Sequence, residues 1–91
     1  MTPRQIDLAR HALGLTKQRV SYRNYFTAGR SHGDYADWMA MVEAGYAMRR
    51  DGANLSFGGD DLFHMTEAGA KCALRPGETL DREHFPPQVG E

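Results

Sequence analysis

The sequence predicts an α+β fold built from three helices and a β-hairpin. Apolar residues recur at the three- and four-residue spacing of a helix face within residues 3–14, 34–52 and 66–75. A glycine- and aspartate-rich turn at residues 58–61 separates two short apolar runs, which is typical of a hairpin. With 91 residues, 41% of them hydrophobic and 25% charged, the chain has the size and composition of one small globular domain.

The composition excludes several classes of protein. No apolar run approaches the roughly 18 residues of a membrane span. The amino terminus lacks the apolar stretch of a signal peptide, so we expect a cytoplasmic protein without a membrane partner. The single cysteine, Cys72, excludes an internal disulfide and a cysteine-rich zinc module. A chain of this length buries about two-thirds of its unfolded surface, which disfavours an enzyme with a deep pocket.

Start and stop signals predict the first helix. Thr2 is the expected N-cap, Pro3 suits the first turn, and Gln5 completes a T-x-x-Q capping box. Gly14 stands where a glycine commonly ends a helix. The apolar face of this helix consists of Ile6, Ala9, Ala12 and Leu13.

Residues 16–30 fit two structures. Val20, Tyr22 and Phe26 alternate as in a short strand, and β-branched and aromatic residues favour that conformation. The same segment, from Arg19 to Phe26, also fits the spacing of a short irregular helix, so both structures stay open. A loop that contains two glycines follows at residues 29–33.

The second helix is expected to begin near Asp34, to continue to Arg50 and to end at Gly52. Asp37 suits the positive end of the helix dipole, and Arg49 and Arg50 suit its negative end. Its apolar face is formed by Tyr35, Trp38, Met41 or Met39, Val42, and Gly45 or Tyr46. Methionines that stay exposed, among Met39, Met41 and Met48, would form an adaptable protein-binding surface or a dimer interface.

The hairpin and the third helix follow. Residues 55–57 and 62–65 are the expected strands, with the turn at residues 58–61 between them. Thr66 is the expected N-cap of a third helix that Pro76 and Gly77 end. The buried side of this helix consists of Ala70, Ala73 and Leu74, with Cys72 as a small buried side chain.

The expected domain comprises residues 1–75, and residues 76–91 form a polar, loosely attached tail. Five apolar side chains, from the three predicted helices and the second hairpin strand, are expected to be largely buried in the core. They are Leu13, Trp38, Val42, Leu62 and Leu74.

The run from Trp38 to Leu74 resembles winged-helix regulators. Residues 38–50 resemble the end of a recognition helix, with a Glu43-Ala44-Gly45-Tyr46 corner and a basic pair that opens the wing. Residues 62–70 resemble the second wing strand and the start of the closing helix. The whole chain also resembles small uncharacterised proteins of bacterial and prophage genomes, through Leu13-Gly14-Leu15 and Tyr22-Arg23-Asn24 among other motifs. The first resemblance implies a winged-helix-like fold and a regulatory, DNA-binding role, and the second implies a bacterial or phage origin but no activity.

Charge is distributed unevenly along the chain. Residues 1–33 carry a net charge of +5 and residues 34–91 a net charge of −6, which together give the overall −1. This division predicts one basic and one acidic surface, if the two halves lie on different faces. The alternative is that the two halves attract and neutralise each other within the fold.

The basic half suggests a nucleic-acid-binding site. No acidic residue occurs between Leu8 and Arg30, and arginines alternate there with aromatic residues. Guanidinium groups bind phosphates, planar rings stack on bases, and an asparagine can read a base edge. The candidate residues are Arg10, Lys17, Arg19, Tyr22, Arg23, Asn24 and Arg30. The alternative is that the aromatic rings belong to the core and the arginine stems cover them.

The acidic half suggests a second, different function. Aspartates in the first turn of the second helix and at the wing repel phosphates, so this surface suits the basic groove of a partner protein. The candidate residues of this protein-binding adaptor or inhibitor are Asp34, Asp37, Asp60 and Asp61.

Motifs for metal binding, cofactor binding or catalysis are missing from the sequence. His11, His32, His64 and His84 are scattered over different predicted elements, without a histidine four residues away or a neighbouring cysteine. No Ser-His-Asp or Cys-His arrangement can be assembled, so we expect neither an enzyme nor a cofactor. His64, on a wing strand, is expected to be half-buried and hydrogen-bonded.

Overall fold

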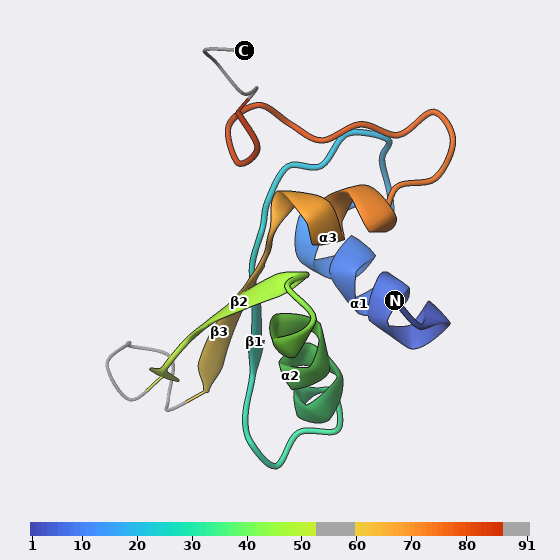
Figure 1. Ribbon diagram of the computed structural model, residues 1–91. Helices are drawn as coiled ribbons and strands as arrows, with labels where there is room; N and C mark the ends of the chain where they lie inside the picture. Colours follow the sequence, from blue (N-terminus) through green and yellow to red (C-terminus); the bar gives the residue numbers. More distant parts are fainter. Residues whose placement is uncertain (53–59, 87–91) are drawn as a thin grey trace.

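A computed structural model describes residues 1–52 and 60–86 and confirms the α+β class. Its elements are α1 (Pro3–Leu13), β1 (Phe26–Ala28), α2 (Tyr35–Glu43), β2 (Ala47–Arg50), β3 (Asp61–Met65) and α3 (Glu67–Cys72). The three strands have the order β1-β3-β2, and both neighbouring pairs are antiparallel. Helices α1 and α2 lie on one side of this sheet, and α3 follows directly from β3 (Figure 1).

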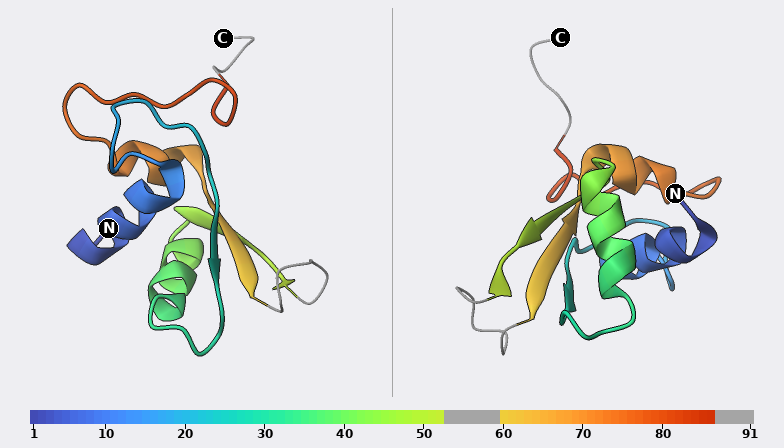
Figure 2. Two further views of the ribbon diagram at one scale, coloured as in Figure 1. Left: turned by 180° about the vertical axis from the view of Figure 1, so that it is seen from behind. Right: turned by 60° about the horizontal axis from the view of Figure 1, so that its bottom comes forward.

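The two ends of the molecule are made by different loops. At one end the segment after α1 runs beside the segment after α3, where Val20 forms a parallel bridge with Thr79. At the other end lies the loop from β1 to α2, as both views in Figure 2 show. The loop after α1 and the loop after β1 therefore lie at opposite ends of the molecule, and the segment that contains β1 connects them.

The core is organised around Trp38, which is fully buried. Its ring stacks on Phe63 of β3 with the centroids 5.3 Å apart, and its centroid lies 5.2 Å from that of Phe26 in β1. Leu13 and Leu62 are buried as expected. The other two predicted core residues, Val42 and Leu74, are partly buried and pack against the core.

Both predicted ends of α1 are confirmed. The Gln5 backbone N–H donates to Thr2 Oγ1 at 3.1 Å, and the Thr2 N–H donates to Gln5 Oε1 at 3.0 Å, which completes the capping box. Gly14 ends the helix with a φ of 79°. A β-carbon at Gly14 would lie 2.2 Å from a ring carbon of Tyr22, so this glycine also makes room for the tyrosine ring.

The second helix is shorter than predicted. It ends at Glu43, and Arg49 and Arg50 lie in β2 rather than in a last helical turn. Gly45 has a φ of 85°, a left-handed conformation that breaks the helix before the chain pairs with β3. The helical spacing of apolar residues continues through this break, which is why the sequence pattern overestimates the length of the helix.

The hairpin prediction is confirmed for its second strand, β3. The predicted first strand, residues 55–57, and turn residues 58 and 59 lie outside the described residues. Within the described residues β3 pairs with β2, where Ala47 is opposite Met65, and with β1, where Phe26 is opposite Phe63.

The open question about residues 16–30 has a definite answer. The helical alternative is wrong, because these residues form no helix and contain the short strand β1. Each helix of the described residues is separated from the next by at least one strand. A helix-turn-helix, in which two helices follow each other directly, is therefore not found in this part of the chain.

The prediction of a loosely attached tail from residue 76 is wrong for residues 76–86. Backbone hydrogen bonds join Thr79 to Arg19 and Ser21, and the Ser21 hydroxyl donates to the Asp81 carboxylate. Leu80 and Phe85 pack against the core. Because these contacts involve residues more than fifty positions apart, the domain extends at least to residue 86.

Two further predictions for single side chains need correction. Thr66 caps α3 as expected, but Cys72 is exposed rather than buried, because α3 buries the face that carries Gly69 and Ala70. The methionines do not form one surface: Met41 is buried, Met39 is partly buried and Met48 is exposed on β2.

The packing of Trp38 leads to a stability prediction. Trp38→Ala removes the contact between α2 and two strands, and we expect it to lower the free energy of unfolding by about 3–5 kcal/mol. Trp38→Phe should cost much less, because the ring contact is kept and Trp38 Nε1 has no hydrogen-bond partner among the described residues. Urea denaturation of both variants measures these differences. A Trp38→Ala protein as stable as the parent would show that Trp38 is not the centre of the core.

Candidate nucleic-acid interface

The segment that leads into β1 presents one guanidinium and two tyrosine rings to solvent. Arg23 Cζ lies 5.3 Å from the ring centroid of Tyr22 and 5.8 Å from that of Tyr25, within the range of cation–π attraction. The two tyrosines are 53% and 52% exposed. We call these three residues the Tyr22–Arg23–Tyr25 cluster.

The end of α1 holds Arg23 in place. Its Nη2 and Nε donate to the carbonyl oxygen of His11 at 2.7 and 3.2 Å. His11 belongs to the last helical turn, where the helix dipole is negative, and its carbonyl oxygen also accepts from the Gly14 N–H at 3.2 Å. A guanidinium has five N–H donors, so three remain for an anion such as phosphate.

A groove between α1 and β1 lies beside this cluster. The His11 ring meets the Phe26 ring edge to face, with the centroids 5.8 Å apart. The lining of the groove next to the cluster is His11, Arg23, Tyr25, Phe26 and Thr27. His11 and Phe26 also line a second hollow, together with residues that include Arg4, Asp7 and Asp34.

The predicted cations do not all reach this cluster. Lys17 and Arg19 are exposed on the segment between Gly14 and Tyr22, and no carboxylate of the described residues forms an ion pair with them. Arg30 is also exposed, but it belongs to the loop from β1 to α2, and this loop lies at the opposite end of the molecule (Figure 1). The structure therefore brings Lys17, Arg19, Tyr22 and Arg23 to one region and leaves Arg30 outside it.

Arg10 is wrongly predicted as a surface residue. It is 5% exposed, and its Nη1 and Nη2 donate to the two carboxylate oxygens of Glu78 at 2.5 and 2.6 Å. The carbonyl oxygens of Ala73 and Leu15 accept two further hydrogen bonds from it. Arg10 thus joins α1 to the loop after α3 and is not accessible to a phosphate.

Asn24 is also wrongly predicted as a contact residue. Its Nδ2 donates to the Met65 carbonyl at 3.0 Å, and its Oδ1 accepts from the Met65 N–H at 2.7 Å. Both ends of the amide are therefore used to extend the pairing of the β1 segment with β3. His64 is half-buried as predicted, and its Nδ1 lies 2.7 Å from the Asn24 carbonyl oxygen.

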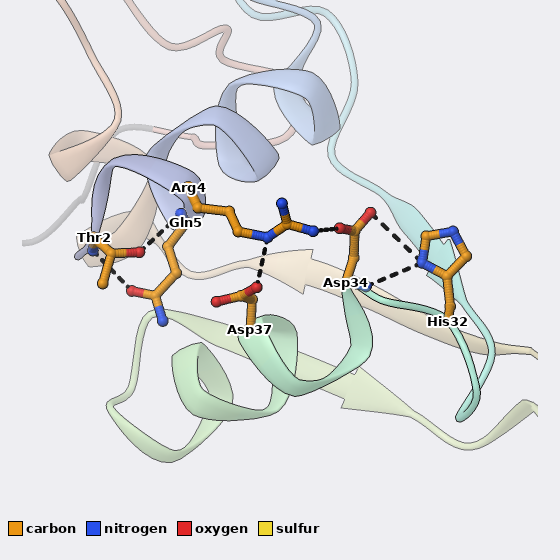
Figure 3. A network of polar contacts seen from close by, with 6 residues as sticks. All are labelled: Thr2, Arg4, Gln5, His32, Asp34 and Asp37. Atoms are coloured by element: carbon orange, nitrogen blue, oxygen red, sulfur yellow. Dashed lines mark hydrogen bonds and ion pairs between the residues drawn. The ribbon is translucent and has the colours of Figure 1, made fainter.

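The aspartates of the second helix are occupied within the fold. Arg4 of α1 lies between them in Figure 3, with Nη2 2.5 Å from Asp34 Oδ1 and Nε 2.8 Å from Asp37 Oδ2. The Asp34 backbone N–H also donates to His32 Nδ1 at 3.1 Å. These contacts join α1 to the start of α2. They also offset the negative charge of the surface that was predicted to bind a protein.

Asp61 is wrongly predicted as an exposed wing residue. It is 2% exposed and accepts hydrogen bonds from the Tyr35 hydroxyl at 2.6 Å, the Gly52 N–H at 2.9 Å and Arg49 Nε at 2.7 Å. The Tyr35 hydroxyl, with the other two donors, holds the pKa of this carboxyl well below its usual range. Asp60 is partly exposed. Of the four predicted acidic residues, it is the one without a hydrogen bond or an ion pair to another described residue.

Among the described residues one group of possible metal ligands has its ligand atoms within 4.8 Å of one another, namely Asp81, Glu83 and His84. Asp81 already accepts hydrogen bonds from the Ser21 hydroxyl and from the His84 N–H, and lies 2.6 Å from His84 Nδ1. Hydrogen bonds within the protein therefore explain why these side chains lie close together, and they give no support to a metal site.

Tyr25 and His11 were not predicted as interface residues. Tyr25 is exposed because Asn24 and Phe26 on either side of it turn inward, as expected for the two-residue period of extended chain. Recognising β1 at Phe26 would have revealed this, but no signal in the sequence brings His11 to the same place.

No family model matches the chain, and no curated protein or solved structure matches it either. None of the helices in the described ranges is long and apolar enough to cross a membrane. A functional assignment therefore depends on the geometry of the site.

The pairing of Arg10 with Glu78 predicts a pH-dependent stability. The Arg10 hydrogen bonds lower the pKa of Glu78 from 4.5 to about 2. Because this pKa is lowered on folding, the stabilisation is complete above about pH 5 and is lost as the pH falls towards 2. We expect Glu78→Gln to melt at a lower temperature at neutral pH and to lose less stability on acidification.

Thermal melting between about pH 2 and pH 7 measures this difference. Glu43→Gln, at an exposed carboxylate near the end of α2, serves as the matched control and should follow the parent protein. Parallel melting curves for Glu78→Gln and the parent would contradict the assigned role of this ion pair.

Proposed function

We propose that this protein is a small, non-enzymatic nucleic-acid-binding module. The observation that carries the proposal is the Tyr22–Arg23–Tyr25 cluster, in which a positioned guanidinium lies between two half-exposed rings. Phosphates bind to guanidinium donors and bases stack on aromatic rings, so the two parts of a nucleotide both find a matching group.

The distribution of ion pairs also supports the proposal. Of the six cations in residues 1–33, Arg4 and Arg10 bind carboxylates from the acidic half of the chain. The other four have no carboxylate partner in the described residues, namely Lys17, Arg19, Arg23 and Arg30. The two halves therefore neutralise each other in part, and three of the four remaining cations lie on the segment that carries the cluster.

The second candidate, an adaptor or inhibitor that binds a protein through an acidic surface, has less support. Asp61 is buried, and Asp34 and Asp37 already bind Arg4. The nucleic-acid proposal includes a regulatory role, which the winged-helix resemblance implies, and a bacterial or phage cytoplasm, which agrees with the resemblance to small bacterial and prophage proteins.

Salt dependence tests the proposal. With about three phosphate contacts, at Lys17, Arg19 and Arg23, we expect affinity to fall about 20- to 40-fold between about 50 and 200 mM salt. The double variant Lys17→Ala, Arg19→Ala should bind more weakly, and the slope of log affinity against log salt should become flatter by about one to two units. Fluorescence anisotropy with labelled DNA and RNA provides the measurement.

A matched double variant controls for net charge. Arg30→Ala with Arg50→Ala removes the same two charges from exposed positions at the other end of the molecule, and it should retain the parent slope. If the two double variants changed the affinity and the salt slope equally, nucleic acid would not bind specifically at the segment that carries Lys17 and Arg19. Absence of binding to both DNA and RNA at about 50 mM salt would contradict the proposed function.

A further inference from the structure

We infer that the nucleic acid recognised by the Tyr22–Arg23–Tyr25 cluster is single-stranded, with bases stacked on the two tyrosine rings. This inference rests on the proposed function and adds the class of ligand. It follows from the shape of the cluster and from the charges on the helices.

The rings are suited to unstacked bases. Tyr22 and Tyr25 are three residues apart on the segment that leads into β1, and Arg23 Cζ lies 5.3 and 5.8 Å from their ring centroids. Both rings are half-exposed, and Arg23 is near both of them. Bases inside a duplex are covered by their neighbours, whereas those of a single strand have exposed faces that stack on aromatic side chains.

The helices are poorly suited to the groove of a duplex. A helix that enters the major groove is flanked by cations that bind the phosphates on either side. In the described helices every arginine and lysine is already paired with a carboxylate: Arg4, Arg10 and Lys71. Helix α2, which the winged-helix resemblance identifies as the recognition helix, contains no arginine or lysine and carries Asp37 and Glu43.

The cations near the cluster that have no carboxylate partner among the described residues instead lie outside the helices. Lys17, Arg19 and Arg23 occur on the segment between α1 and β1, in the same stretch as the two tyrosines. The groove lined by His11, Phe26 and Thr27 continues from Tyr25 along β1. Such a row of cations and rings follows the backbone of a flexible strand more closely than the fixed width of a duplex groove.

Three labelled probes separate the classes of ligand in an anisotropy titration. They are oligothymidine of about 15 nucleotides, oligouridine of the same length and a blunt DNA duplex of the same length. We expect the protein to bind at least one of the two single strands more than tenfold more tightly than the duplex. The relative affinities for oligothymidine and oligouridine then show whether DNA or RNA is preferred.

Variants of Tyr25 test the stacking itself. Tyr25 is chosen because the Tyr22 ring packs against Gly14, so Tyr22→Ala would also change the fold locally. Tyr25→Ala should weaken single-strand binding about 5- to 150-fold, and Tyr25→Phe, which keeps the ring, should stay within about twofold of the parent. Binding of heparin, a polyanion without bases, should be unchanged in both variants.

The outcomes distinguish this inference from the proposed function. Duplex binding as tight as single-strand binding, or unchanged single-strand affinity in Tyr25→Ala, would overturn the inference and leave a nucleic-acid-binding protein. Failure to bind any of the three probes at about 50 mM salt would instead refute the proposed function on which the inference rests.

Discussion

The packing of Trp38 between Phe63 and Phe26 is the contact on which the rest of the structure depends. It fixes α2 against two strands, and it sets which face of the β1 segment points inward. Because successive residues of an extended chain point to opposite faces, the inward position of the partly buried Phe26 leaves Tyr25 and Thr27 on the outside. The exposed half of the candidate interface is thus a direct consequence of how the core is packed.

Ion pairs between the two halves of the chain also hold the fold together. Arg4 joins the amino-terminal helix to the start of α2, and Arg10 joins it to the loop after α3. These pairs use cations that would otherwise widen the basic surface, and carboxylates that would otherwise form an acidic one. What remains is a narrow basic and aromatic segment between α1 and β1, which is why we propose that nucleic acid binds there.

Local signals in the sequence predicted the elements that local interactions determine. The caps at Thr2 and Thr66 and the glycine at the end of α1 lie within a few residues of the groups they bind, and all three predictions are confirmed. Strand β2 was missed because its partner strand lies beyond residues 53–59. A helical apolar period that crosses Gly45 does not reveal such a distant pairing.

The candidate site depends even more on contacts between residues that are distant in the sequence. Arg10 and Asn24 looked like surface residues because their partners, Glu78 and Met65, are 68 and 41 positions away. Composition brought attention to Arg23 and Tyr22, because that segment contains no acidic residue. It did not distinguish a cation held inside the fold from one that faces solvent, since that difference arises from tertiary contacts.

The most direct test is to map the binding surface residue by residue. In an NMR titration of the labelled protein with oligothymidine and oligouridine, backbone amide signals report which residues a ligand approaches. The account predicts that changes concentrate in residues 15–27, around Arg23 and Tyr25, and that the signals of α2 stay in place. Changes centred on α2 and Asp60, with residues 15–27 unaffected, would contradict it.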